Sequence, residues 1–520
     1  MSGKPVLNGA ESMIHTMVGA GVDTCFANPG TSEMAFVAAL DLIEGIRPVL
    51  TLDESVATGA ADAYGRVLGR PAATLLHTGP GLFNGASNLH NARRARSPVL
   101  NIVGDHARDH RGLDTPLTTD IEAIARTCSD TVITASSAPQ DTARAIAACG
   151  TGQGSGRVTS LILPADIAWS AAAGPADPLP VAARLPAPES RVLRAAELLR
   201  GSKKAGIVLA GDALRPAALR YAAAIAATCG ARIMAANLVA CLRVGAGAVA
   251  VETIPYAVDA AVAFLAAFDT LILVSANSPA AFFAYPDKPG LLAPAGARQY
   301  RLTEAGEDSE ATLESLAQTL GADSDAVPLI ALDRPDIAQG EITPARLGQS
   351  IAALLPDEIL LVDESVSVGA KWPSLLRSAA PHDLLKNMGG SIGFGLPASV
   401  GAALASPGRK VICLEADGSA MYTPQALWSQ ARERLDVLTV ILANRQYAIL
   451  RNEYRNIGAG EPGPRGMEML DIGRPVLDWC GLANALGVES GRATTMEEFN
   501  TLFTTFRAGG RGPCLIEVVV

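Results

Sequence analysis

The sequence predicts an α/β fold of three doubly wound domains, each built on a parallel β-sheet. Two observations support this prediction. Short apolar or β-branched runs alternate with helical runs along the chain, a pattern typical of βαβ units. Two linker-like segments, residues 171–190 and 320–345, also divide the 520 residues into three blocks, which fits domains of about 100–200 residues. We therefore expect domains over residues 1–172, 188–325 and 342–520.

The first block contains four strand-like segments. Residues 22–27, 47–52, 72–77 and 98–105 are short apolar or β-branched runs, and residues 32–43 repeat apolar side chains at helical spacing. Strands of a parallel sheet are buried on both faces, so they read as apolar runs instead of alternating patterns. We expect a turn and a helix after each of these strands.

The second and third blocks repeat this organisation. Strands are expected at residues 205–211, 231–237 and 269–277, and then at 358–365, within 409–419, within 436–446 and at 513–520. The uncharged stretch 387–408 is rich in Gly, Pro and Ser. A membrane-spanning helix needs roughly 20 predominantly apolar residues, so this stretch is expected to form a buried loop and helix.

The composition excludes several classes of protein. With 49% hydrophobic and 18% charged residues, the chain can build sizeable cores. Its net charge of −10 lacks the basic excess of a nucleic-acid binder. Eight scattered cysteines without a CxxC pair favour a reducing compartment over a disulfide or zinc framework. Because the N-terminus also lacks a signal-peptide core, we expect a cytoplasmic protein that binds neither nucleic acid nor membrane.

The most specific motif lies within residues 414–450. One strand ends at Asp417-Gly418-Ser419, and Asn444 follows the next strand, 27 residues after Asp417. Ligands bind at the carboxyl edge of open α/β sheets, and side-chain oxygens of this type suit a Mg²⁺ ion that also binds phosphates. An Asp-Gly pair after a strand is, taken alone, a common turn. The spacing to Asn444 instead favours a metal-bridged diphosphate, next to a helix N-terminus that attracts phosphate.

Residues 414–450 resemble the thiamine diphosphate (ThDP) binding motif, which runs from a Gly-Asp-Gly triplet to a downstream Asn. The chain departs from that motif at Ala416, which replaces the first glycine, and at Arg445, which replaces the second of the usual paired asparagines. Neither change removes a side-chain metal ligand. The resemblance extends along the chain to the family of acetolactate synthase and benzoylformate decarboxylase. It implies a pyrimidine-binding, a central and a diphosphate-binding domain, in that order.

The resemblance also implies the residues of a cofactor site. Asp417 and Asn444 would give side-chain oxygens to Mg²⁺, and Gln446 would give its backbone carbonyl. Gly390 would offer a carbonyl to the 4′-amino group of the cofactor, and Ile392 would support its bent shape. The residues expected at the diphosphate are Ser367, Gly418, Ser419 and Tyr447. Each of these would be a turn or core residue in most chains, so their joint fit to one cofactor carries the assignment.

The triplet Asp-Glu-Ser occurs twice after a strand-like run, in "TLDESVATGAADAYGR" (51–66) and in "LVDESVSVGAKW" (361–372). The resemblance places Glu54 at the glutamate that hydrogen-bonds a ring nitrogen of the aminopyrimidine. A carboxyl group in apolar surroundings resists ionisation and can share its proton with that nitrogen. The alternative is a solvated acid at a helix N-terminus, stabilised by about 0.3–1 kcal/mol. Glu364, in the second triplet, has no expected chemistry.

Further residues of the first block match benzoylformate decarboxylase. Thr31, with Ser32 beside it, aligns with a serine that contacts the substrate carboxylate, and His77 matches a histidine that would relay protons. The second histidine of that enzyme comes from the central domain, where this chain has none. The corresponding region, residues 278–290, offers Tyr285 and two phenylalanines. The residues expected to shape the substrate pocket are Phe282, Phe283, Ile449 and Leu450.

Taken together, the resemblance implies a ThDP- and Mg²⁺-dependent enzyme that decarboxylates a small 2-oxo acid without oxidation, through an enamine. One alternative is a carboligase of the acetolactate synthase type, which joins the enamine to a second 2-oxo acid or aldehyde. Another is a non-catalytic ThDP-fold subunit or sensor. The central block has no GxGxxG after a strand, so nicotinamide binding is not expected. Binding of FAD to this block is left open, and its absence is favoured. A homodimer or homotetramer with active sites at the dimer interface is implied, and no motif identifies the 2-oxo acid.

Overall fold

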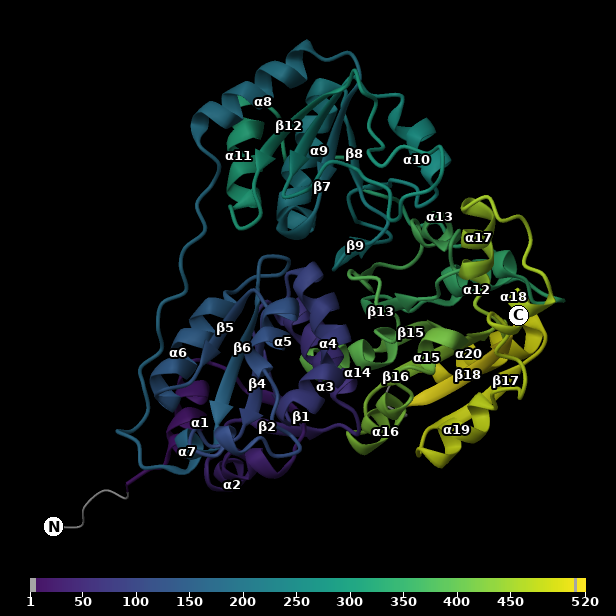
Figure 1. Cartoon of the computed structure of the whole chain (residues 1–520). Coiled ribbons are helices and arrows are strands. Elements are labelled where there is room, and N and C mark those ends of the chain that lie inside the picture. Colours follow the sequence, from purple (N-terminus) through teal and green to yellow (C-terminus); the bar gives the residue numbers. More distant parts are fainter. Residues whose placement is uncertain (1–5, 509–511) are drawn as a thin grey trace.

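The computed structural model describes residues 6–508 and 512–520 and contains three β-sheets, each flanked by helices (Figure 1). The first and third sheets, with their helices, lie side by side, and the middle one lies above them. Parallel pairing dominates all three sheets, which confirms the fold class expected from the sequence. No helix among the described residues is both long and apolar enough to cross a membrane.

The first sheet is parallel throughout, with strand order β2-β1-β3-β4-β6-β5. Its strands are β1 (Thr24–Asn28), β2 (Arg47–Leu50), β3 (Ala72–Leu76), β4 (Val99–Asp105), β5 (Thr131–Thr134) and β6 (Val158–Pro164). Its helices are α1 (Gly9–Gly19), α2 (Met34–Leu42), α3 (Glu54–Leu68), α4 (Thr78–Ala95), α5 (Ile121–Cys128), α6 (Ala138–Cys149) and α7 (Ala165–Trp169), with 3₁₀ turns at Thr31–Glu33 and Arg111–Leu113.

The second sheet is also parallel, with strand order β10-β8-β7-β11-β12. Its strands are β7 (Ala205–Leu209), β8 (Arg232–Ala235), β10 (Glu252–Thr253), β11 (Thr270–Val274) and β12 (Arg298–Thr303). The flanking helices are α8 (Glu189–Gly201), α9 (Pro216–Cys229), α10 (Val258–Leu265) and α11 (Ser309–Leu320), with a 3₁₀ turn at Gly211–Leu214.

The third sheet has strand order β17-β18-β16-β15-β13-β14-β9. Its strands are β13 (Ile359–Glu364), β14 (His382–Lys386), β15 (Val411–Ala416), β16 (Val437–Ala443), β17 (Glu489–Ala493), β18 (Cys514–Val519) and β9 (Leu242–Val244). Its helices are α12 (Pro344–Leu354), α13 (Trp372–Leu376), α14 (Gly395–Ala405), α15 (Asp417–Ala420), α16 (Gln425–Arg432), α17 (Ala448–Asn456), α18 (Pro464–Glu468), α19 (Trp479–Ala485) and α20 (Met496–Phe506).

Strand β9 connects the central segment to the third sheet. It lies between β8 and β10 in the sequence, yet it pairs antiparallel with β14 at the edge of the third sheet. Leu242 lies opposite Leu384, and Val244 lies opposite His382. The polypeptide between the two central strands therefore anchors the middle domain to the third one.

Helices α3 and α14 form the contact between the first and third domains. The sequence of α3 is rich in Ala and Gly, and its buried side chains include Ala57, Ala60 and Ala61. A carbon atom added at Gly401 of α14 would lie 1.9 Å from the Ala60 carbonyl oxygen, so only glycine permits this approach. One buried apolar cluster consequently runs from Phe26 of the first sheet to Phe394 beside α14.

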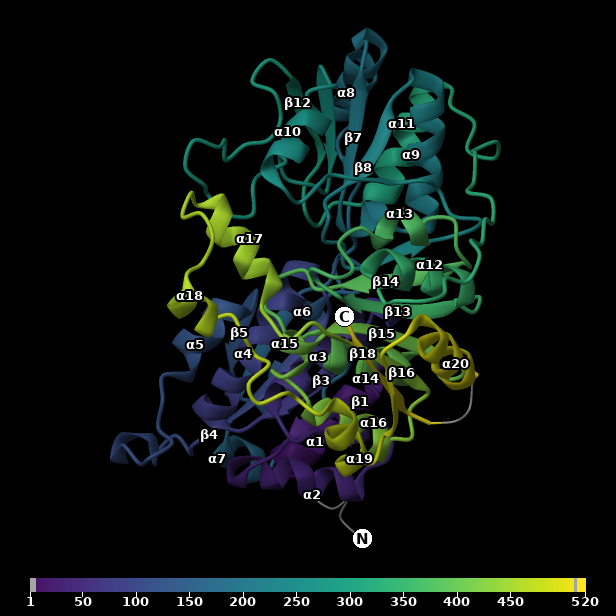
Figure 2. The ribbon, with the colours of Figure 1, turned by 90° about the vertical axis from the view of Figure 1, so that its right-hand side faces the viewer.

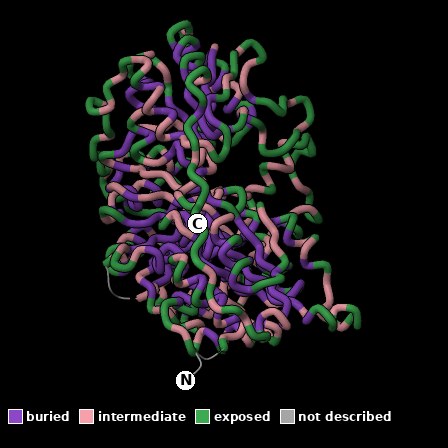
Figure 3. The backbone as a smooth tube through the Cα atoms, turned by 90° about the vertical axis from the view of Figure 1, so that its left-hand side faces the viewer, coloured by how far each residue is buried: buried purple, intermediate pink, exposed green. Residues whose placement is uncertain are grey.

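Burial follows this organisation. Figure 3 shows that the buried stretches are concentrated in the part of the molecule where the first and third domains pack together. The segment 387–408, expected as a buried loop and helix, contains α14, whose residues are all buried. Figures 1 and 2 show helix α17 standing out from the third domain toward the loops of the middle domain. This places α17 and the middle domain on the same side of the third sheet.

Candidate active site

Glu54 begins helix α3 directly after Asp53, whose side chain caps the helix by accepting a hydrogen bond from the Ser55 amide. The Glu54 side chain is buried, with 7% exposure. Its two oxygens accept hydrogen bonds from the side-chain amides of Asn28, at 3.2 Å, and Asn84, at 3.0 Å. The helix around Glu54 is apolar, as expected, but its carboxyl group faces two amide donors. These amides hold the carboxyl group in one orientation without supplying a charge.

His77 stands at the carboxyl end of β3, one residue before helix α4. Its Nδ1 atom lies 2.9 Å from Oε2 of Glu33 and 3.1 Å from Oγ of Ser32. Glu33 is buried to 1% exposure and also accepts a hydrogen bond from the Gly30 amide. A carboxylate at Nδ1 favours the tautomer that carries its proton there, which leaves Nε2 as a proton acceptor. Thr31 is exposed at the start of the same turn.

Glu33 is a site residue that the sequence did not single out. It lies in "NPGTSE", three residues after Gly30, and its carboxylate caps that turn by accepting the Gly30 amide at 2.8 Å. An acid three residues after a turn glycine is the only signal in the sequence that points to Glu33. The contact with His77 exists because β1 and β3 are parallel neighbours, with Asn28 opposite Leu76. Their carboxyl ends, and the turns that follow, therefore meet at one edge.

Asp417 and Asn444 follow the neighbouring strands β15 and β16. Asp417 is buried, and its Oδ2 accepts a hydrogen bond of 2.7 Å from the backbone amide of Arg445, which ties the two strand ends together. Asn444 Oδ1 accepts from the amide of Gln446 at 3.1 Å. Burial raises the pKa of the Asp417 carboxyl group. A nearby cation would stabilise its charged form.

The described residues contain no group of three or more His, Cys, Asp or Glu side chains that could hold a metal ion. The oxygens at the ends of β15 and β16 are one carboxylate, one side-chain amide and the backbone around Gln446. This donor set fits Mg²⁺, which uses few protein oxygens and completes its shell with water and phosphate. It would not hold Zn²⁺, which prefers four nitrogen or sulfur-rich ligands.

The turn after β15 is closely packed against Tyr447. A carbon atom added at Gly418 would lie 2.6 Å from Cε1 of Tyr447, so the ring lies directly on this turn. Ser419 is buried in α15, and burial also raises the pKa of Tyr447. Ser367 is half-buried in the loop after β13, the strand that pairs with β15. All of these residues belong to the carboxyl ends of the third sheet.

A third group of residues lies around the loop between β14 and α14. Gly390, in this loop, has a φ angle of +77°, a conformation that side chains strongly disfavour. An added carbon atom there would lie 2.7 Å from Cζ of Phe282, so a middle-domain residue covers this glycine. Phe282 and Phe283 form an edge-to-face pair with ring centres 4.9 Å apart. Ile392 is half-buried in the same loop.

Helix α17 is linked to the same middle-domain segment. The Tyr285 hydroxyl donates a 2.5 Å hydrogen bond to Glu453 of α17, and burial together with this carboxylate raises the pKa of Tyr285. Ile449 is half-buried and Leu450 is 46% exposed at the start of the helix. Aromatic residues of segment 278–290 and the first turns of α17 therefore lie on one side of the site.

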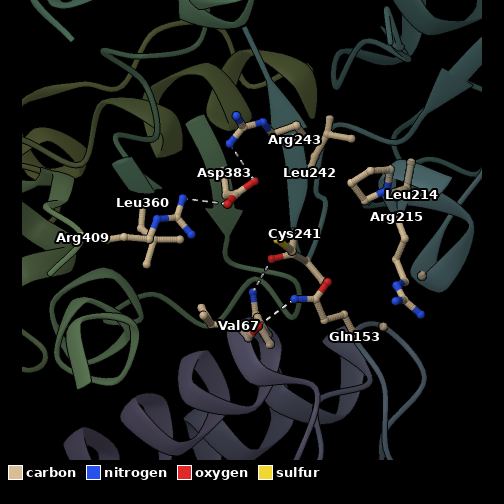
Figure 4. Close-up of a pocket in the computed structure, with 15 residues that line it drawn as sticks. Val67, Gln153, Leu214, Arg215, Cys241, Leu242, Arg243, Leu360, Asp383 and Arg409 are labelled. Carbon is tan, nitrogen blue, oxygen red and sulfur yellow. Dashed lines mark hydrogen bonds and ion pairs between the residues drawn. The ribbon is translucent and has the colours of Figure 1, made fainter. Parts of the chain in front are cut away.

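A separate cavity of about 210 Å³ lies where the three domains meet (Figure 4). Its lining includes Val67, Gln153, Cys241 and Leu360, and none of the residues expected at the cofactor or substrate. In Figure 4, Asp383 lies between Arg243 and Arg409, at 3.5 Å and 2.8 Å. The charges of these three side chains are thus partly neutralised by ion pairs, one between the central segment and the third domain and one within the third domain.

The chain is similar to known proteins along most of its length. The family model described as the thiamine pyrophosphate enzyme N-terminal TPP binding domain matches residues 7–131, and the corresponding C-terminal TPP binding domain matches residues 370–518. A Mycobacterium tuberculosis protein named as an acetolactate synthase large subunit is 47% identical over 99% of both chains. A benzoylformate decarboxylase of Pseudomonas aeruginosa is 31% identical over 96% of each chain.

Solved structures show the same fold. The ThDP-dependent 4-hydroxybenzoylformate decarboxylase of Rhodococcus jostii RHA1 matches 99% of both chains with a TM-score of 0.83 and 26% identity. A benzoylformate decarboxylase from Polynucleobacter necessarius, at 22% identity, shares the fold with a TM-score of 0.83 over 99% of this chain and 98% of its own. Because its relatives match over nearly their full length, the chain belongs to the thiamine pyrophosphate enzymes and is a ThDP-dependent enzyme of the decarboxylase and acetolactate synthase family.

Proposed function

We propose that the protein catalyses the Mg²⁺-dependent, non-oxidative decarboxylation of a small 2-oxo acid with ThDP as its cofactor. The observation that carries this proposal is His77, held by the buried Glu33 at the carboxyl edge of the first sheet. Decarboxylation to an aldehyde requires that a proton be delivered to carbon, and a histidine with a fixed tautomer can deliver it. The cofactor, when bound, supplies the electron sink for the bond that breaks.

The third domain would hold the cofactor by its diphosphate. Asp417, Asn444 and the backbone carbonyl of Gln446 would bind Mg²⁺, because their oxygens lie at adjacent strand ends. The residues proposed to contact the diphosphate are Ser367, Gly418, Ser419 and Tyr447. Gly390 and Ile392 would contact the pyrimidine half, from the loop between β14 and α14.

Glu54 would hold a proton against a ring nitrogen of the aminopyrimidine. Its burial and its two amide neighbours, Asn28 and Asn84, support this role because they orient the carboxyl group without a salt bridge. Thr31 and Ser32 would contact the carboxylate of the substrate, next to His77. The acyl group would lie against Phe282, Phe283, Ile449 and Leu450.

We also propose that the active protein is a homodimer or homotetramer whose sites combine two subunits. Large apolar side chains are exposed next to both halves of the proposed site. Leu52 and Phe83 flank the Glu54 region, and Met421 and Tyr422 follow α15, with exposed fractions between 40% and 58%. Exposed apolar side chains gathered near functional loops are typical of interaction surfaces. Sedimentation equilibrium of the purified protein tests this proposal, and a monomer at micromolar concentration would contradict it.

A carboligase is the second candidate. The relative named as an acetolactate synthase large subunit is 47% identical, compared with 31% for the benzoylformate decarboxylase. The experiment that separates the two functions is incubation with ThDP, Mg²⁺ and one 2-oxo acid at a time, beginning with pyruvate and benzoylformate. Release of CO₂ with formation of an aldehyde supports decarboxylation, whereas exclusive formation of acetolactate from pyruvate would refute it in favour of the carboligase.

We further propose the cytoplasm as the location of the protein, and residues 1–172, 188–325 and 342–520 as the limits of its three domains.

A further inference from the structure

Glu364, in the second Asp-Glu-Ser triplet, has no part in the function proposed so far. It is the last residue of β13 and its side chain is buried, with 4% exposure. It lies beside residues 387–394, the loop between β14 and α14, which we call the Gly390 loop. A buried carboxylate is costly unless its oxygens are hydrogen-bonded, so its partners indicate what it does.

The partners of Glu364 are the buried Glu415, opposite it on β15, and groups at both ends of the Gly390 loop. Its Oε2 atom accepts hydrogen bonds from three consecutive backbone amides, those of Gly393 at 3.2 Å, Phe394 at 2.8 Å and Gly395 at 2.9 Å. Its Oε1 atom accepts from Nδ2 of Asn387 at 2.9 Å. Burial raises the pKa of the Glu364 carboxyl group, and the hydrogen bonds from Asn387, Phe394 and Gly395 oppose this rise. One carboxylate therefore joins the first residue of the loop to its last two.

Asn387 extends this constraint to the middle of the loop. Its Oδ1 atom accepts hydrogen bonds from the amides of Gly389, at 3.1 Å, and Gly390, at 2.9 Å. Its Nδ2 atom also donates to the Ser391 carbonyl at 2.6 Å. These bonds hold Gly390 in its positive-φ conformation, and they leave the Gly390 carbonyl outside the network made by Asn387.

Helix α4 of the first domain holds the opposite side of the loop. Asn91 donates to the Ser391 carbonyl at 2.8 Å and accepts from the Ser391 amide at 3.2 Å. Asn88 donates to the Gly393 carbonyl at 3.2 Å. The loop is thus shaped by protein groups on two sides before any ligand contributes.

We propose that Glu364 is a positioning residue that fixes the Gly390 loop in the shape that receives the pyrimidine half of the cofactor. This inference rests on the proposed function, because it takes Gly390 and Ile392 as contacts of that half. Pre-organisation of a binding loop increases affinity because less conformational freedom is lost on binding. The diphosphate half would lie at the ends of β15 and β16, whereas the hydrogen bonds of Glu364 described above run to the Gly390 loop. We therefore expect Glu364 to act mainly on the pyrimidine half of the cofactor.

The test compares two ligands that share the diphosphate end. Binding of ThDP and of inorganic pyrophosphate, each with Mg²⁺, is measured by titration calorimetry on the wild type and on Glu364→Gln. We expect the dissociation constant of ThDP to rise at least tenfold in the variant, and that of pyrophosphate to change less than twofold. A residue that only stabilises the fold would leave both unchanged or weaken both equally, and either result overturns the inference. The matched control is Glu358→Gln, an exposed glutamate near the other end of β13, which should alter neither constant.

A second variant covers the case in which Glu364→Gln does not fold. Asn91→Ala removes the two hydrogen bonds between α4 and Ser391 and leaves Glu364 in place. The dissociation constant of ThDP should rise by a smaller factor, at least threefold, and that of pyrophosphate should stay unchanged. A ThDP affinity equal to that of the wild type would overturn the inference. If the wild type binds pyrophosphate but not ThDP, the proposed function itself fails, and the role of Glu364 fails with it.

Discussion

Nδ1 of His77 lies 2.9 Å from a carboxylate oxygen of Glu33, and Glu33 is almost completely buried. The same carboxylate accepts hydrogen bonds from the Gly30 amide and the Ser32 hydroxyl, so its position is fixed by three partners. This contact holds the imidazole in one orientation and favours the tautomer with the proton on Nδ1, which leaves Nε2 as a proton acceptor. In the function proposed above, His77 would act on the substrate and Glu33 would act through His77.

Replacing Glu33 with Gln tests this relationship. The amide cannot stabilise a protonated imidazole as a carboxylate does, so kcat should fall by about tenfold or more, within the roughly 10²–10⁴-fold contribution of a positioned proton donor. The KM for the 2-oxo acid should change little. The exposed Glu44→Gln is the matched control. An unaltered kcat in Glu33→Gln would show that the contact is only structural.

Glu54→Gln should separate catalysis from cofactor binding. The variant keeps the shape of the side chain and can still contact a ring nitrogen, but it has no proton to share. Turnover, followed by CO₂ release, should fall by about 10²–10⁴-fold, while ThDP binding, followed by calorimetry, should weaken less than tenfold. Turnover close to that of the wild type would refute the role assigned to Glu54.

Removal of the metal should release the cofactor. Chelation with EDTA should abolish activity and ThDP binding together, and added Mg²⁺ should restore both. Asp417→Ala should lose the same two properties and should not recover at high Mg²⁺, because a ligand at the strand end is missing. Tight ThDP binding by Asp417→Ala in the presence of EDTA would contradict the metal assignment.

The sequence was sufficient to predict site residues that come directly after strands of the same domain. Asp417 and Asn444 were expected at one edge because consecutive strands of a parallel sheet present their carboxyl ends together, and β15 and β16 are indeed neighbours. The family was likewise expected from this motif and is confirmed by the relatives. The roles of the individual residues remain predictions.

Contacts between distant segments could not be predicted in this way. Glu33 meets His77 only because β1 and β3 pair, and no local pattern indicates which strands become neighbours. Strand β9 has three residues and a register that is set by β14, so it is too short to show a pattern of its own. Glu364 and Glu54 stand in two copies of the same triplet. Glu364 accepts hydrogen bonds from backbone amides of residues 393–395, whereas Glu54 accepts from two asparagine side chains.

The contact between α3 and α14 should be intolerant of added volume. Gly401→Ala places a carbon atom 1.9 Å from the Ala60 carbonyl oxygen. The helices must separate, and overpacking of this kind costs roughly 1–3 kcal/mol. The melting temperature should therefore fall. Gly201→Ala, at the end of α8 with no atom within 4 Å of the added carbon, is the matched control and should leave the melting temperature unchanged or raise it slightly. Equal melting temperatures for the two variants would contradict the close contact.

His382 should make the stability of the protein depend on pH. It is completely buried at the start of β14, and this burial lowers the pKa of its imidazole, which stays neutral with Nδ1 hydrogen-bonded to the Ala380 carbonyl. The unfolded chain binds a proton here below about pH 6.5, whereas the folded chain does so only at lower pH. Stability is therefore full above about pH 6.5 and is lost as the pH falls through this value toward the lowered pKa of the folded state.

His382→Asn keeps a donor near the Ala380 carbonyl but removes the titrating group. Between pH 7.5 and pH 5.5, the melting temperature of the wild type should fall further than that of this variant, because only the wild type gains a proton on unfolding at residue 382. The exposed His15→Asn is the matched control and should retain the full pH dependence of the wild type. An identical fall in all three proteins would mean that other groups account for the loss of stability, and that the imidazole of His382 is solvated enough in the folded state to titrate normally.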